Sequence, residues 1–245
     1  MLPSNDSRTL SQLFHLNSEP WAGPETWESL EDTLDYGDGN RSTAVALPPR
    51  HETPLGNLLQ RRVSCRAYAD RPLAARDLAS LLWSGYGIAR GVVEPQLTTY
   101  RTVPSAGALY PLELLALTRR VEALEDGLYR YEAAAHELQP RGLTSVAGDA
   151  WRDALLAEPA ARTANLIVFI VAVFDRTQRK YGPRGYRYAL LEAGHVAQNI
   201  CLTATELGLG SLCLGGYRDA KLNALLGLDS RRVGVVYGVI VGHPA

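Results

Sequence analysis

Basic and phenolic side chains alternate in the stretch RTQRKYGPRGYRYALLEAGHVAQN, residues 176–199. A plain hinge needs glycine and proline, which are present, but not three tyrosines interleaved with basic residues. Lys180 and Tyr181 are adjacent, and Arg184 and Arg187 follow closely. Nearby positive charges disfavour a protonated lysine, so the pair could supply a general base near neutral pH. A surface loop of solvated cations is the alternative, and this stretch taken alone favours it.

Arginines and a serine cluster in RRVSCRAY, residues 61–68, just past a segment with helical spacing. Guanidinium groups and a hydroxyl together can bind several oxygens of a phosphomonoester through charge-assisted hydrogen bonds. The candidate residues for such a site are the three arginines and the serine, Arg61, Arg62, Ser64 and Arg66. A solvated basic surface is the alternative, which spacing alone favours.

Small residues form two further candidate loops, in RTVPSAGALYPLE (residues 101–113) and in LGGY (residues 214–217). Small side chains let backbone N–H groups approach a flat ligand or its polar edge. The small residues of the first loop are Pro104, Ser105, Ala106, Gly107 and Ala108. In the second loop the glycine pair Gly215 and Gly216 follows Leu214 and can present an N–H to a ring nitrogen. A plain loop and a turn are the respective alternatives.

Several familiar motifs are missing from the 245 residues. The stretch GLGSLCLGG lacks the third glycine of a dinucleotide fingerprint and precedes a strand-like run instead of following one. No GxxxxGK[ST], GxSxG or HExxH occurs. Five histidines and three cysteines are too few for an obvious metal cluster. These absences disfavour kinase, hydrolase, Rossmann and metalloenzyme functions.

The amino-acid composition is typical of a globular protein. The formal net charge is -1, so no overall positive charge attracts nucleic acid or anionic lipid. The longest apolar run, LIVFIVAVF, is about half the ~18 residues that span a bilayer, and the N-terminus has no signal-peptide pattern. Cys65, Cys201 and Cys213 form no CxxC pair, which indicates buried thiols in a reducing compartment. The expected location is cytoplasmic.

Periodicity defines the elements that must position the candidate residues. Residues 1–50 are polar and are expected to form an N-terminal arm, and residues 51–245 a domain. Apolar residues at helical spacing predict helices over residues 55–62, 72–88, 145–158, 186–207 and 219–228. Strands are predicted over residues 112–120, 165–175, 211–217 and 233–243, with a hairpin over residues 127–140. Helices and strands are mixed along the chain without strict alternation, which favours an α+β fold with a central sheet. Lys180 and Tyr181 are expected on a loop after the 165–175 strand.

In this order, the motifs resemble those of the nitroreductase superfamily, and more narrowly its SagB-type azoline dehydrogenases. The resemblance covers residues 55–244 and rests on RRVSCRAY, PSAGALYPLE, GLYRYEAAAHEL, KYGPRGYRYALLEAGHVAQN and ELGLGSLCLGGYRD. PSAGALYPLE combined with KYGxRGYR is rather specific to this branch. The resemblance implies a central mixed or antiparallel sheet flanked by helices, in an obligate homodimer that binds FMN.

The same resemblance assigns roles to the candidate residues. It assigns Arg62, Ser64 and Arg66 to an Arg-x-Ser-x-Arg element that binds FMN, with Arg62 near the phosphate and Arg66 near the ribityl chain or the N1–O2 edge of the ring. It implies that residues 104–107 reach the flavin of the partner subunit, that the backbone of residues 214–216 approaches N5, and that Lys180 and Tyr181 act on the substrate. Nitroreductases often add basic residues from a C-terminal extension, whereas this sequence ends at VGHPA. The possible substitutes are Arg184, Arg187 and Arg218.

The implied activity is oxidation of a thiazoline or oxazoline to an azole, in a peptide or a carrier-bound natural-product intermediate made by another protein. Aromatisation removes two electrons, which pass to the flavin, and two protons, one of them taken by a base. Molecular oxygen is the simplest final acceptor, because no dinucleotide motif is visible. The alternatives are an NAD(P)H-dependent nitro or quinone reductase and a non-catalytic flavoprotein partner of a biosynthetic complex.

Overall fold

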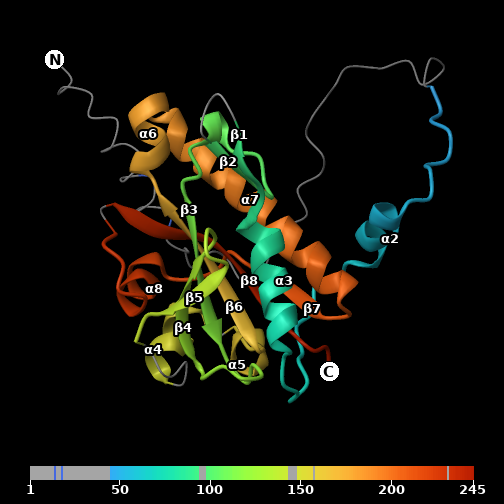
Figure 1. Ribbon diagram of the computed structural model, residues 1–245. Coiled ribbons are helices and arrows are strands. Elements are labelled where there is room, and N and C mark those ends of the chain that lie inside the picture. The colour runs from blue at the N-terminus through green and yellow to red at the C-terminus, as the bar shows by residue number, and fades with distance from the viewer. Residues whose placement is uncertain are drawn as a thin grey trace, which may run out of the picture.

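The computed structural model describes residues 14, 18, 45–93, 98–142, 148–156, 158–230 and 232–245 (Figure 1). Most of the predicted N-terminal arm therefore lies outside the described residues. The helices are α2 (Pro54–Arg61), α3 (Ala75–Tyr86), η2 (Ala106–Ala108), α4 (Asp149–Ala154), α5 (Ala160–Thr163), α6 (Asp175–Tyr181), α7 (Arg184–Glu206) and α8 (Asp219–Leu225). The strands are β1 (Ile88–Val93), β2 (Thr98–Arg101), β3 (Leu112–Thr118), β4 (Gly127–Glu132), β5 (Glu137–Pro140), β6 (Leu166–Val173), β7 (Gly210–Leu214) and β8 (Val233–Gly242).

One antiparallel sheet with the strand order β5-β4-β3-β6-β8-β7 forms the centre of the fold. Strand β6 lies in its middle and is buried along seven of its eight residues, as its unbroken apolar run predicted. Strand β7 is an edge strand, and Ser64 extends the sheet beyond it through a parallel bridge to Ser211. The predicted α+β class with a central sheet is confirmed.

Two hydrophobic cores form because successive side chains of a strand point to opposite faces of the sheet. On β3, Leu114 and Ala116 face one core with α3 and α7, whereas Leu115 and Leu117 face the other with α4 and α8. Figure 1 shows α3 and α7 side by side along the sheet, and α4, α5 and α8 gathered elsewhere on it. The sheet thus fixes the position of α7, the longest described helix.

Three predictions of local structure were incomplete or wrong. The segment that carries Lys180 and Tyr181 is the helix α6, not a loop. The helix predicted over residues 145–158 covers only Asp149–Ala154 among the described residues of that range. The antiparallel pair β1–β2 was not predicted, because its short strands include Gly91 and carry little alternation.

The described residues contain no helix that is both long and apolar enough to cross a membrane. Within the same residues, no three His, Cys, Asp or Glu side chains gather as a metal site would require. The expectation of buried thiols is correct for Cys201 but wrong for Cys213, which is exposed on β7.

Candidate active site

Lys180 and Tyr181 lie against the small-residue loop of their own chain. An alanine methyl group built at Gly107 would meet the Tyr181 Oη at 2.6 Å and the Lys180 Nζ at 2.8 Å. Gly107 has a φ of +61°, a left-handed conformation that glycine adopts readily. The predicted catalytic pair and the predicted loop 104–107 therefore form one cluster.

Helix α6 presents the pair at its last turn. Asp175 lies in the first turn and two basic residues in the last, an arrangement that complements the helix dipole. The helix ends because Gly182 adopts a φ of +58°, and its N–H donates to the Gln178 carbonyl at 2.7 Å. The Tyr181 ring then packs edge-on against Tyr188 of α7, with centroids 5.1 Å apart, so its orientation is fixed from both sides.

Glu192 on α7 is a buried carboxylate that anchors the loop 104–107 through a hydrogen bond from Ser105. Ser105 donates to its Oε2 at 2.5 Å, and Tyr86 donates to its Oε1 at 2.6 Å. The same two hydroxyls accept from the Tyr110 N–H at 2.9 Å and the Leu112 N–H at 3.2 Å, which ties the carboxylate to the backbone after the loop. Burial raises the pKa of Glu192, although both hydrogen bonds oppose this shift.

Glu192 was not among the predicted site residues. The available signal was an acidic residue on the inward face of a helix, in line with Ala189, Ala193 and Val196. A carboxylate on such an apolar stripe must find hydrogen-bond partners inside the protein.

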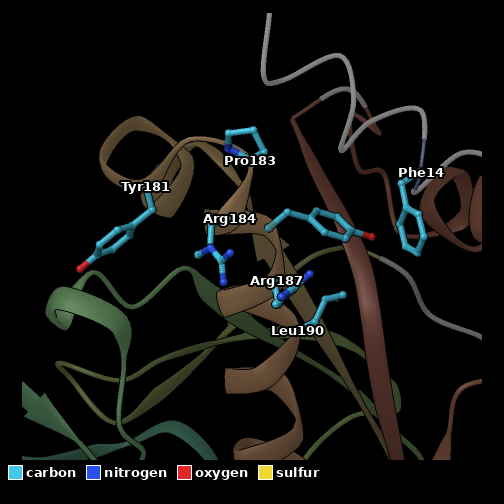
Figure 2. Close-up of a pocket in the computed structure, with 7 residues that line it drawn as sticks. Phe14, Tyr181, Pro183, Arg184, Arg187 and Leu190 are labelled. Carbon is cyan, nitrogen blue, oxygen red and sulfur yellow. The ribbon is translucent and has the colours of Figure 1, made fainter. Parts of the chain in front are cut away.

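A groove of about 570 Å³ opens beside the pair, at the start of α7. Figure 2 shows Tyr181 at one end of this groove and Phe14 at the other, with Arg184 and Arg187 between them. Phe14 packs edge-on against Tyr186, with ring centroids 5.7 Å apart. The side chains of both arginines are exposed, so the groove combines an aromatic lining with positive charge.

The second cluster of predicted residues surrounds the edge strand β7. The Cys65 N–H donates to the Ser211 carbonyl at 2.8 Å, which fixes the segment 62–66 beside this strand. Arg62 is close enough to influence the titration of Cys213 at the end of the strand. The chain end holds the same segment, because the Ala245 N–H donates to the Ala67 carbonyl at 3.1 Å. Arg62, Ser64 and Arg66 therefore lie at the edge that leads into Gly215 and Gly216.

The loop after β7 offers its backbone to an outside group. Leu214 is 4% exposed and contributes its side chain to the core, so only its backbone can serve a site. Gly215 and Gly216 are exposed, and a methyl group at either would come no closer than 3.7 Å to the chain. The fold itself does not require glycine there, whereas a ligand that approaches the backbone closely would.

The segment that carries Arg62 lies at one end of α7, and the Lys180–Tyr181 pair lies at the other. Lys180 and Tyr181 precede its first residue, whereas an Arg61 N–H donates to the Thr205 carbonyl in its last turn. Its 23 residues span about 33 Å at 1.5 Å per residue. Within one chain, Arg62 therefore lies far from the Lys180–Tyr181 pair. The loop after β7 leads back toward the start of α7, where burial and the nearby Asp219 raise the pKa of Tyr186.

The three further basic residues considered for a phosphate differ in position. Arg184 and Arg187 belong to the groove at the start of α7, far from Arg62. Arg218 follows the glycine pair but forms an ion pair with Asp153, with Nε and Oδ1 3.2 Å apart. Of the three, Arg218 alone lies near the edge that carries Arg62.

Comparison with known proteins places these motifs in a family. Residues 59–243 match the family model described as "Nitroreductase family". The chain is 38% identical over 184 residues to "Putative nitroreductase MJ1384" of Methanocaldococcus jannaschii. The aligned residues cover 74% of this chain and 88% of that protein. It is 35% identical over 147 residues to "Microcin B17-processing protein McbC" of Escherichia coli. The aligned residues cover 54% of this chain and 50% of McbC.

The fold comparison extends further than the sequence comparison. The solved E. coli microcin synthetase McbBCD complex with truncated pro-MccB17 bound matches with a TM-score of 0.71 at 21% identity, over 99% of this chain and 94% of that chain. At this identity the match shows the fold, and the fold agrees with the family match. The motifs, the antiparallel sheet and the match over residues 59–243 all show that this chain belongs to the nitroreductase family.

Proposed function

We propose that this protein is an FMN-dependent dehydrogenase that oxidises thiazoline or oxazoline rings to azoles in a peptide or a carrier-bound intermediate. The observation that carries the proposal is the contact between the Lys180–Tyr181 pair and Gly107. Two motifs far apart in the sequence meet there, and both belong to the pattern that resembles azoline dehydrogenases. The family match supports an oxidoreductase, and the match to McbC, a microcin-processing protein, supports the narrower activity.

FMN fits the edge of β7. Members of the nitroreductase family bind flavin, and this chain offers matching groups. Arg62 and Arg66 would hold the phosphate and the ribityl side, and the exposed N–H groups of Gly215 and Gly216 would meet the ring edge. Bound FMN supplies a two-electron acceptor.

A homodimer would bring the two clusters to one flavin. Because Arg62 and the Lys180–Tyr181 pair lie at opposite ends of α7, about 33 Å long, a flavin whose phosphate one chain holds would receive Gly107, Lys180 and Tyr181 from its partner. The surface of the chain supports such a partner, since exposed leucines lie on α2, on α7 and just after α7, namely Leu55, Leu59, Leu191 and Leu207. Gly194 lies exposed in the middle of α7, and a Cβ atom added there would meet no atom of the chain within 4 Å. The fold does not require glycine at this position, although glycine weakens a helix. A closely approaching second chain would explain it.

Different residues of the chain would take the separate roles in this reaction: the base, its positioning and the binding of the substrate. Aromatisation of an azoline ring requires removal of a proton from carbon while two electrons leave the ring. The Lys180 Nζ and Tyr181 Oη, which converge above Gly107, provide the base. Glu192 orients the loop through Ser105, and the groove along Tyr181, Arg184 and Arg187 admits a peptide or carrier arm. Molecular oxygen is the proposed final acceptor.

The substrate is proposed to come from another protein. McbC is named for processing microcin B17, and the McbBCD structure contains a bound pro-peptide, which supports a peptide substrate and partner proteins here. A synthetic peptide with a single thiazoline or oxazoline is therefore the first substrate to assay.

Lys180→Ala and Tyr181→Phe test the catalytic pair. Each should abolish azole formation, followed as the loss of two hydrogen atoms by mass spectrometry, while the purified protein keeps its flavin absorbance. Arg179→Ala and Tyr188→Phe are matched controls, because Arg179 is the exposed neighbour on the same helical turn and phenylalanine at position 188 keeps the ring that packs against Tyr181. Equal turnover by wild type and both pair variants would remove the pair from the mechanism.

Mixing two inactive variants tests the shared site. Arg62→Gln impairs the flavin cluster and Lys180→Ala the catalytic cluster. If each site combines clusters from two chains, a mixed dimer contains one intact site, and random re-association should restore roughly a quarter of wild-type activity. No recovery, with mixed dimers confirmed by mass spectrometry, would show that each chain builds its own site.

The competing function is an NAD(P)H-dependent nitro or quinone reductase on the same fold. Stopped-flow mixing with NADPH separates the two. Rapid bleaching of the flavin by NADPH would favour the reductase, whereas flavin bleached only by an azoline peptide would support the dehydrogenase. Isolation of a colourless protein that binds no FMN would instead favour a non-catalytic partner.

A further inference from the structure

Two of the three cysteines meet directly behind the flavin-binding loop proposed above. Cys201 lies on α7 and is 2% exposed, whereas Cys213 lies on β7 and is exposed, two residues before Gly215. Their sulfur atoms are 3.7 Å apart. The third cysteine, Cys65, is separate from this pair and donates to the Ala67 carbonyl at 3.2 Å.

The surroundings make the two thiols unequal. A hydrogen bond from the Cys201 thiol lowers the pKa of Cys213 to about 6, and Tyr237 and Arg62 add to this effect. The same hydrogen bond, together with burial, raises the pKa of Cys201. A thiolate is the reactive form of cysteine, so the accessible thiol is also the activated one near neutral pH.

We propose that Cys213 and Cys201 form an oxidation site in which Cys213 reacts with a hydroperoxide and Cys201 then closes a disulfide with it. The exposed thiol is the peroxidatic group, and the buried thiol resolves the product. The pair thereby makes the base of the Gly215–Gly216 loop sensitive to peroxide. This inference does not depend on the proposed reaction of the flavin site.

The two steps balance with hydrogen peroxide as the oxidant. The Cys213 sulfur forms a bond to one peroxide oxygen, the O–O bond breaks, and the products are a sulfenic acid and water. The Cys201 sulfur then forms the S–S bond, the S–O bond breaks, and a second water leaves with the Cys201 proton. In total, two thiols are oxidised and one peroxide is reduced to two waters.

The distance allows this closure with a small movement. A disulfide has an S–S length of about 2.05 Å, so the sulfur atoms must approach by about 1.7 Å. The move would take the Cys213 sulfur away from Tyr237 and would join β7 covalently to α7. Cys65 lies outside this geometry and serves as the internal control.

Thiol counting on the flavin-loaded protein tests the proposal. After treatment with hydrogen peroxide and quenching with catalase, denatured wild-type protein should show one free thiol out of three, and peptide mapping should link Cys201 to Cys213. Cys65→Ser should form the same link. In Cys213→Ser, Cys201 should remain a free thiol, because it is buried and has no activated partner.

Cys201→Ala removes the resolving thiol. Its Cys213 should progress to the acids with two or three added oxygen atoms, which the disulfide prevents in the wild type. Retention of three free thiols in the wild type overturns the proposal. A link that involves Cys65, or over-oxidised Cys213 beside a free Cys201 in the wild type, overturns it as well.

Discussion

Replacing Gly107 by alanine would place a methyl group between the small-residue loop and the Lys180–Tyr181 pair. The new carbon would lie 2.6 Å from the Tyr181 Oη and 2.8 Å from the Lys180 Nζ, whereas ordinary contact begins at 3.4 Å. Both groups must therefore retreat by more than half an ångström. Since both are the ends of flexible side chains, this retreat costs little stability, but it moves the atoms that the proposed function makes catalytic.

The expected effects on stability and activity differ. A positive φ costs alanine roughly 1–2 kcal/mol of folding stability, and this penalty is independent of the pair. Misplacement of reacting groups on this scale costs about 10- to 100-fold in rate, since 1 Å can cost 10²-fold. Gly107→Ala should therefore keep its FMN and lose about 10- to 100-fold in kcat for azole formation.

Gly227→Ala is the matched control for the backbone. Gly227 has a φ of +66°, no atom lies within 4 Å of its added methyl group, and it follows α8, away from the pair. Urea unfolding should give similar losses of stability for both variants, and only Gly107→Ala should lose kcat. Equal kcat for the two variants would refute the conclusion that close approach at Gly107 positions the catalytic pair.

Two further substitutions test the elements around the site. Glu192→Gln should cost roughly 1–3 kcal/mol, because an amide cannot accept from both Tyr86 and Ser105 through equivalent oxygens. Burial raises the pKa of Glu192 above its usual 4.5, so the folded wild type holds its proton more tightly; the advantage of wild type over the variant should shrink as the pH rises from about 4.5, measured by urea unfolding. Gly194→Ala should weaken the dimer and release FMN, followed by size exclusion with absorbance detection. A gain of about 1 kcal/mol with dimer and FMN unchanged would mean that no partner lies at this position.

Most of the fold could be predicted because its elements are encoded locally. The unbroken apolar run of β6 favours a strand buried on both faces, because it is only eight residues long and rich in valine and isoleucine. The spacing of Leu78, Leu81 and Leu82 favours a helix with one buried face. The glycine-interrupted pair β1–β2 carries no such pattern, which is why it was missed. The helix α6 was missed because its seven residues are mostly polar and its form depends on Asp175 and Gly182 at its ends.

The candidate site, like the fold, was predictable where local motifs encode it and not where it depends on tertiary contacts. Motif order supplied the family and the site residues, and the family match over residues 59–243 confirms the nitroreductase assignment. The roles of the individual residues remain predictions. Glu192 escaped detection because its importance depends on Tyr86 and Ser105, which only the folded chain brings to it.

The sequence by itself determined which groups are available: a lysine–tyrosine pair, an arginine–serine cluster, and two loops of small residues. Local patterns also determined the strands of the central sheet and the long helix, because apolar periodicity acts through near neighbours. Only the tertiary structure decided that Lys180 and Tyr181 meet Gly107, and that α7 holds them far from Arg62. Such distances depend on how a sheet and a rigid helix pack, and no spacing along the chain contains them.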